Sequence, residues 1–354
     1  MDKILITGMA GFIGSHLAAR CVKAGFQVVG LDNLNDYYDV NLKLDRLKFL
    51  GFSSLGDADI VENRSLGASE NLAFIKTDLT SRETTADIFH REKPEVVIHM
   101  AAQAGVRHSI EHPHAYIRSN IEGFLNVLEG CRHHRVKHLL FASSSSVYGL
   151  NRKMPYSEHD HTDHPVSLYG ATKKGGEMMA HAYSRLYGIP CTGLRLFTVY
   201  GPYGRPDMSP MIFSRRIVSG QFLEVFNYGR MERDFTYIDD VTEAICRLIP
   251  IPPAENPEWN GQAPDPQESA APYRIINVGG GRPQKLEDFI QVLARFLGKK
   301  ARKRGLPMQK GDVLKTYSDT SELYALTGFT PVVDLEEGIR RFVRWYKDYH
   351  GIRP

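Results

Sequence analysis

Cysteine is scarce in this chain of 354 residues, and the few cysteines stand far apart. Cys21, Cys131, Cys191 and Cys246 form no Cys-x-x-Cys pair. This spacing argues against a disulfide framework and against a cysteine-based metal site. We therefore expect free thiols in a reducing compartment and no bound metal.

The chain also has little excess of one charge sign and few long hydrophobic runs. The formal net charge is only +3 at pH 7, which is too small to indicate a nucleic-acid partner. The apolar run near the N-terminus is broken by Gly8, Gly11 and Gly14, so we expect it to be neither a signal peptide nor a membrane span. The expectation is a cytoplasmic protein without nucleic-acid or membrane partners.

The same glycines are the first informative motif that is present. They follow a strand-like apolar run and precede a helical pattern, so the backbone there can approach a pyrophosphate at a helix N-terminus. A second apolar run ends in Asp32, where a carboxylate accepts hydrogen bonds from an adenosine ribose and repels a 2′-phosphate. This pattern predicts NAD rather than NADP. The alternative for Asp32 is an aspartate that only caps a turn.

Tyr169 and Lys173 form the second motif, with spacing that places a phenol and an ammonium group on one helix face. A tyrosinate base at neutral pH needs its pKa lowered by about 3 units from its usual value near 10, and a neighbouring cation lowers it. Together with the glycine motif, this pair predicts a redox enzyme.

Apolar strand-like runs alternate with helical stretches, which predicts an α/β fold with a Rossmann-type, doubly wound parallel sheet. We expect an NAD-binding domain over residues 1–197 and a smaller mixed α/β lobe for the substrate over 198–354. A segment near 239–249 is expected to pack back on the first domain. Segments 51–71 and 249–272 are predicted to be exposed loops that leave the regular fold, and they are called the two excursions below. The predicted strands are 3–7, 27–31, 72–77, 95–100, 138–143 and 191–197, and the predicted helices are 12–24, 116–134 and 167–187.

Seven motifs in one order carry a family resemblance. They occupy residues 7–14, 32–38, 101–107, 143–149, 169–173, 195–202 and 233–240. In these motifs the chain resembles the extended short-chain dehydrogenases/reductases, and within them the UDP-glucuronate 4-epimerases of the UDP-sugar epimerase group. The two excursions are poorly matched.

The resemblance implies roles for individual residues. Ser144, Tyr169 and Lys173 are the implied catalytic group, with Ser144 relaying a hydrogen bond between the sugar O4 and the phenol. Besides Tyr169 and Lys173, the implied cofactor contacts are Gly8, Gly11, Phe12, Ile13, Gly14, Asp32, Asn33, Asp78, Leu79, Ala101, Ala102, Gln103 and Asn120.

The residues after Ser144 distinguish chemistries within the group. Related dehydratases carry an Asp-Glu pair there, and related decarboxylases a Glu at the second position, whereas this chain has Ser145 and Ser146. Neutral hydroxyls do not repel a substrate carboxylate and can donate hydrogen bonds to it. Thr198, in place of the Asn of UDP-galactose epimerases, leaves room for a uronate, and Arg205 is a candidate counter-charge.

The remaining implied substrate contacts lie toward the nucleotide. Arg233 matches a diphosphate-binding arginine, Phe226 is placed against uracil, and Asp312 suits the uridine ribose. A core phenylalanine is the alternative for Phe226.

The prediction is NAD-dependent C4 epimerisation of UDP-glucuronate to UDP-galacturonate through a transient 4-keto sugar. A UDP-glucuronate decarboxylase or a neutral UDP-hexose 4-epimerase is the alternative. A non-catalytic NAD-binding regulatory protein is a third reading, which the intact Ser144, Tyr169 and Lys173 disfavour. The resemblance also implies a homodimer.

Overall fold

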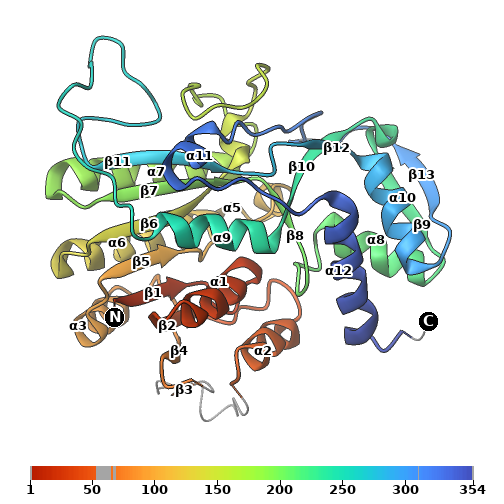
Figure 1. Cartoon of the computed structure of the whole chain (residues 1–354), viewed down its shortest axis with the longest axis horizontal. Coiled ribbons are helices and arrows are strands. Elements are labelled where there is room, and N and C mark those ends of the chain that lie inside the picture. Colours follow the sequence, from red (N-terminus) through yellow and green to blue (C-terminus); the bar gives the residue numbers. More distant parts are fainter. Residues whose placement is uncertain (1, 53–64, 67–68, 310, 353–354) are drawn as a thin grey trace.

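The computed structural model describes residues 2–52, 65–66, 69–309 and 311–352, and its centre is an eight-stranded sheet (Figure 1). Seven strands are parallel, and the short β3 pairs antiparallel with β4 at one edge. The spatial order is β11-β7-β6-β5-β1-β2-β4-β3. The strands are β1 (Lys3–Thr7), β2 (Gln27–Asp32), β3 (Ser65–Leu66), β4 (Leu72–Lys76), β5 (Val96–His99), β6 (His138–Ser144), β7 (Cys191–Leu196) and β11 (Tyr273–Val278).

Helices cover both faces of this sheet, with α3, α6 and α7 on one face and α1, α9 and α11 on the other (Figure 1). The helices are α1 (Phe12–Lys23), α2 (Val40–Phe49), α3 (Arg82–Glu92), α4 (His108–Glu111), α5 (Pro113–Ile117), α6 (Gly123–His134), α7 (Leu168–Tyr187), α8 (Ser209–Val218), α9 (Ile238–Leu248), α10 (Leu286–Leu297), α11 (Ser321–Thr327) and α12 (Leu335–Tyr349).

The strand sequences explain this layering. Neighbouring residues of a strand point to opposite faces, so Ile4 and Ile6 enter one apolar core while Leu5 enters the other. All three are fully buried, as expected of a parallel strand with helices on both sides. The doubly wound fold predicted from the alternating pattern is confirmed.

A smaller lobe lies beside the sheet and has its own apolar core (Figure 1). Phe289 of α10 and Phe342 of α12 are fully buried in that core, together with Leu223. The lobe holds α8, α10 and α12 and two small sheets. Their strands are β8 (Thr198–Tyr200), β9 (Phe222–Phe226), β10 (Glu232–Tyr237), β12 (Pro283–Lys285) and β13 (Arg302–Leu306).

Two elements from the second half of the chain lie with the large sheet. Helix α9, which spans most of the segment near 239–249, packs against α1. Strand β11 follows the long 249–272 segment and pairs with β7. Sequence analysis missed this strand, although all six of its residues are buried. Residues 198–354 are thus shared between the two parts, and the division near residue 197 stays a prediction.

The other boundaries differ from the sequence pattern in small ways. The helix expected over 116–134 is interrupted by a π-helical turn at Arg118–Glu122, between α5 and α6. In the 51–71 excursion, residues 53–64 and 67–68 lie outside the described residues. No helix in the described part of the chain combines the length and the apolar character needed to cross a membrane.

Candidate active site

The carboxyl ends of the parallel strands open into one cavity at the point where the strand order reverses, between β1 and β5. In doubly wound sheets this point is where ligands bind, because the connecting loops diverge to either side of it. The lining includes loops after β1, β2, β5 and β6 and residues of the smaller lobe. The fold therefore joins residues far apart in the sequence into one site.

The turn from β1 into α1 has no room for side chains. Gly8 has φ +72°, and a Cβ on it would lie 2.8 Å from the Ala101 nitrogen. A Cβ on Gly14 would lie 2.1 Å from the Gly8 carbonyl oxygen. Helix α1 starts after Gly11, which has no side chain to cap it, so the N–H groups of its first turn are open to an anion. This geometry fits the pyrophosphate of a dinucleotide.

Asp32 ends β2 and lines the same cavity. Its Oδ1 accepts a hydrogen bond from the Leu34 N–H at 2.9 Å, and the Lys43 ammonium lies 4.0 Å from the same oxygen. Asp32 therefore caps a local turn and also faces the cavity. The turn-capping role and the position expected of a ribose acceptor are both compatible with this geometry. Among the described residues the second oxygen of Asp32 has no protein partner, so that oxygen can accept from a ribose hydroxyl.

The predicted catalytic group meets where β6 and α7 approach each other. Ser144 ends β6, and its Oγ accepts from the Ser146 N–H at 3.1 Å. Tyr169 and Lys173 lie one turn apart on α7 and line the cavity with Ser144. Burial raises the pKa of the Tyr169 phenol above its usual range, and Ser144 and Arg205 act in the opposite direction. The catalytic roles themselves stay a prediction.

Lys173 differs from the sequence expectation in its contacts. Its ammonium donates to the carbonyl oxygen of Ala142 at 2.8 Å, and burial lowers its pKa to about 8. We expected Lys173 to lower the pKa of Tyr169, but here that influence comes from Ser144 and Arg205. The bond to β6 was not predictable from the sequence. Helical spacing determines on which face of the helix a side chain lies, but not which residue it contacts.

Arg205 is held by two residues that sequence analysis did not select. Its Nε donates to Asp207 Oδ1 at 3.0 Å, and the Tyr37 hydroxyl donates to Asp207 Oδ2 at 3.0 Å. Burial opposes ionisation of Asp207, but Arg205 and Tyr37 keep the pKa of its carboxyl below the usual value. Two features of the sequence could have identified these residues: Tyr37 lies within a matched motif, and Asp207 lies two positions after Arg205.

Arg233 and Asp312 form the opposite end of the cavity. Arg233 Nη2 lies 2.7 Å from Asp312 Oδ1, and the Arg233 side chain is only 15% exposed. Its Nη1 donates to the Leu314 carbonyl oxygen at 3.2 Å. A pre-positioned guanidinium of this kind suits a diphosphate, because its planar donors match two phosphate oxygens.

All but two of the predicted site residues line this one cavity. They are Gly8, Gly11, Phe12, Ile13, Gly14, Asp32, Asn33, Asp78, Leu79, Ala101, Ala102, Gln103, Ser144, Ser145, Ser146, Tyr169, Lys173, Thr198, Arg205, Arg233 and Asp312. The exceptions are Asn120 and Phe226.

Asn120 is buried behind the cavity, in the π-helical turn. Its side chain accepts from the Gln103 N–H at 2.8 Å and donates to Thr172 Oγ1 at 3.0 Å. Asn120 thus ties the loop after β5 to α7 and acts on the cavity lining from behind. At Phe226 the Arg107 guanidinium lies 5.1 Å from the ring centre. The contact of Phe226 with uracil stays a prediction.

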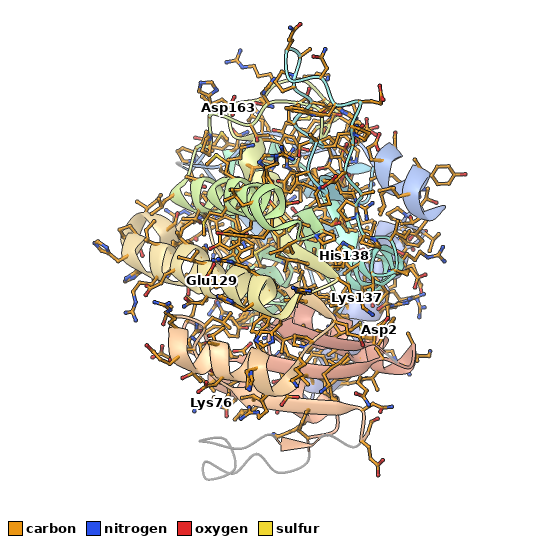
Figure 2. The ribbon with its side chains drawn as sticks, turned by 90° about the vertical axis from the view of Figure 1, so that its left-hand side faces the viewer. Asp2, Lys76, Glu129, Lys137, His138 and Asp163 are labelled. Carbon is orange, nitrogen blue, oxygen red and sulfur yellow. The ribbon has the colours of Figure 1, made fainter. Side chains whose placement is uncertain are left out.

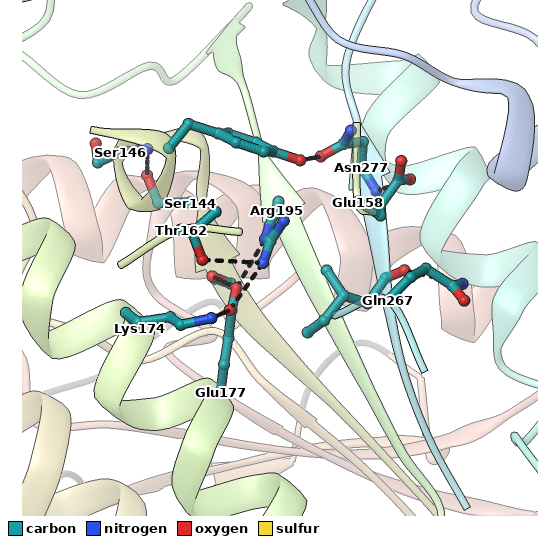
Figure 3. A network of polar contacts seen from close by, with 12 residues as sticks. Ser144, Ser146, Glu158, Thr162, Lys174, Glu177, Arg195, Gln267 and Asn277 are labelled. Atoms are coloured by element: carbon teal, nitrogen blue, oxygen red, sulfur yellow. Dashed lines mark hydrogen bonds and ion pairs between the residues drawn. The ribbon is translucent and has the colours of Figure 1, made fainter. Parts of the chain in front are cut away.

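A buried ion pair supports the end of β6 from below (Figure 3). Glu177 of α7 accepts from Arg195 Nε on β7 at 2.9 Å and from the Ser143 hydroxyl at 2.6 Å. Both members of the pair are almost completely buried. Because α7 carries Tyr169 and β6 ends at Ser144, the bond from Ser143 to Glu177 holds these two elements together, and Arg195 joins β7 to them.

Glu158 lies in the same network and gives a test of stability against pH (Figure 3). It is fully buried, and burial raises its pKa from 4.5 to about 7. The folded state then binds a proton more tightly than the unfolded state, so stability falls as the pH rises from 4.5 to about 7. We expect Glu158→Gln to raise the free energy of unfolding at pH 8 by up to ~3 kcal/mol and to change it little at pH 4.5.

Urea unfolding of both proteins at the two pH values measures this difference. The amide oxygen of the variant can still accept from the Asn277 N–H, now 2.7 Å from Glu158 Oε1. Glu336→Gln is the control, because Glu336 pairs with Arg295 on the surface. An unchanged pH profile in Glu158→Gln would show that the carboxyl is not protonated in the folded state.

The fold and site define a class: a Rossmann-type enzyme with a dinucleotide cradle beside a tyrosine, serine and lysine group. A family comparison agrees with this class, because residues 4–260 match the NAD dependent epimerase/dehydratase family. The chain belongs to that family.

Individual relatives are similar over nearly their full length. Protein CapI of Staphylococcus aureus is 49% identical, covering 98% of this chain and 99% of the relative. A probable UDP-glucuronate 4-epimerase of Rhizobium meliloti is 45% identical, covering 97% and 96%. The crystal structure of a UDP-glucuronic acid 4-epimerase of Bacillus cereus, in complex with UDP-glucuronic acid and NAD, superposes with a TM-score of 0.82. It is 30% identical and covers 98% of this chain and 99% of that one.

Proposed function

We propose that the protein is an isomerase, a UDP-glucuronate 4-epimerase with NAD as its cofactor. The observation that carries this is a cavity in which Tyr169 shares the lining with Ser145, Ser146 and Thr198. Ser145 and Ser146 stand where related dehydratases carry an Asp-Glu pair, and Ser146 stands where related decarboxylases carry a Glu. The hydroxyls can receive a sugar carboxylate without like-charge repulsion. The relatives named as UDP-glucuronate 4-epimerases support the same function.

Tyr169 begins the reaction by taking the proton of the C4 hydroxyl, with Ser144 bridging the phenol and the sugar oxygen. The glycine turn and Asp32 would hold NAD, which would supply a reversible hydride acceptor for C4. Because the site holds the hexose lightly, the 4-keto sugar can rotate about its diphosphate linkage and present its opposite face. Tyr169 then gives the proton back to O4, and C4 is inverted because the opposite face of the keto sugar has been reduced.

The two ends of the cavity hold the substrate differently. Arg233 anchors the diphosphate, and Asp312 is proposed to accept from the uridine ribose. Near the hexose, Ser145, Ser146 and Thr198 offer only neutral hydroxyl donors to the carboxylate. The site would bind UDP firmly and the sugar weakly. The keto sugar can rotate only if it is bound in this way.

Arg205 is proposed as the counter-charge of the uronate. Its bond to Asp207 limits the net positive charge that it presents, so the sugar carboxylate is not fixed in one orientation. This compensation suits an intermediate that has to turn within the site.

Incubation with UDP-glucuronate distinguishes this function from its alternatives. We expect UDP-galacturonate, with neither CO₂ nor a UDP-pentose, and we expect UDP-glucose to be a poor substrate. Release of CO₂ would show a decarboxylase, and efficient conversion of UDP-glucose would show a neutral-sugar epimerase. A protein that retains NAD and converts neither would be a binding protein.

Asp32 gives a test of the cofactor. NAD is regenerated in each cycle, so we expect it to copurify with the protein. Asp32→Ala removes the ribose acceptor and should weaken NAD binding by ~1–3 kcal/mol. The NAD released on denaturation, measured per chain, reports retention. Asp36→Ala is the matched control, because Asp36 is exposed in the same loop and does not line the cavity. Purified protein that holds no NAD and requires NADP would contradict the assignment.

We propose a homodimer formed through α6 and α7, which lie side by side on the face turned to the viewer in Figure 2. Both helices expose large apolar side chains, and such chains on one face are typical of an interface. They are Leu125, Met178, Leu186 and Tyr187. A cytoplasmic location is proposed from the four free cysteines.

A further inference from the structure

One turn of helix at the rim of the cavity carries three side chains of metal-ligating type. They are His108, Glu111 and His112 of α4 and its C-terminal cap. Their ligand atoms all lie within 4.8 Å of one another. His108 is half-buried, while Glu111 and His112 are exposed. His108 begins α4 and His112 caps its C-terminal end, and their closeness lets both imidazoles reach one ion.

These ligand atoms are free of other polar bonds. Within the described ranges, none of the three side chains takes part in a hydrogen bond or an ion pair. The two imidazole rings pack with their centres 4.3 Å apart.

We propose that His108, Glu111 and His112 bind a divalent transition-metal ion of the Zn²⁺ type. Two imidazole nitrogens and one carboxylate oxygen are a common zinc donor set, and a water completes the tetrahedron. Ca²⁺ and Mg²⁺ prefer sites made of oxygen alone, so this donor set discriminates against them. The sequence expectation of no metal considered cysteine ligands and did not weigh this histidine pair.

The location links the ion to the rim of the sugar site. The His108 ring packs on Tyr37 with ring centres 4.6 Å apart, and the Tyr37 hydroxyl donates to Asp207, the partner of Arg205. An ion that fixes His108 would therefore also restrain Tyr37. The metal site does not depend on the proposed reaction, because its ligands lie outside the catalytic group.

Direct titration of the full-length protein tests the proposal. After removal of metals with a chelator, Zn²⁺ alone is titrated against the protein in competition with a chromogenic zinc indicator. We expect one site per chain that is lost or weakened at least ~10-fold in His112→Ala and in His108→Ala. Glu111→Gln should weaken it as well, while Mg²⁺ in excess should not compete. Co²⁺ should give the visible absorption of a tetrahedral site.

His114→Ala is the matched control, because His114 is an exposed histidine on the adjacent α5 and is not part of the cluster. It should retain the site unchanged. Circular dichroism melting of each metal-free variant checks that the fold is intact. Zinc affinity that is equal in wild type, His112→Ala and His114→Ala would overturn the proposal and show only scattered surface binding.

Discussion

Tyr169→Phe is expected to lower turnover of UDP-glucuronate by about 10²–10⁴-fold or more, because it removes the group that takes the O4 proton. The substitution keeps the ring, which packs edge-on against Tyr116 with centres 6.2 Å apart, and it keeps the helix. Binding of UDP-glucuronate should therefore survive. Steady-state kinetics of epimerisation, together with calorimetric titration of the sugar nucleotide, measures the two effects separately.

The control for this variant is Tyr183→Phe. Tyr183 lies on the same helix and donates to Glu129 on α6, away from the cavity. Its replacement should leave turnover near that of wild type. Epimerisation by Tyr169→Phe at a rate close to wild type would exclude the phenol as the base. Ser144 or another group would then have to take the proton.

Arg233→Ala should have the opposite effect, a loss of binding rather than of chemistry. Arg233 is mostly buried and paired with Asp312, so its removal takes away the diphosphate contact and leaves a carboxylate facing the ligand. Truncating one partner of a buried charge pair costs about 2–5 kcal/mol, which is roughly 30-fold or more in affinity. Titration with UDP and with UDP-glucuronate should show the same loss, because both share the diphosphate.

Arg230→Ala is the matched control for Arg233, because Arg230 is an exposed arginine a few residues earlier and does not line the cavity. It should bind UDP like wild type. If Arg233→Ala weakened UDP-glucuronate but not UDP, the guanidinium would have to contact the sugar rather than the diphosphate. The two variants, Tyr169→Phe and Arg233→Ala, thus test opposite ends of the cavity.

The sequence by itself determined the features that depend on neighbouring residues. Gly8 and Gly14 signal a turn because close backbone approach excludes side chains there. The spacing of Tyr169 and Lys173 places both on one face of α7, because a helix repeats every 3.6 residues. Apolar runs separated by helical stretches indicated the doubly wound sheet, because both faces of a parallel sheet are buried.

The tertiary structure decided which of these local features meet. Strand β11 joins the sheet after a long irregular segment, so the alternation of strand-like and helical runs did not predict it. Ala142, not Tyr169, receives the bond from the Lys173 ammonium, and Asp207 is shared by Arg205 and Tyr37. Such contacts depend on the packing of remote segments. Local periodicity fixes only the side to which each residue points, and the folded chain fixes its partner.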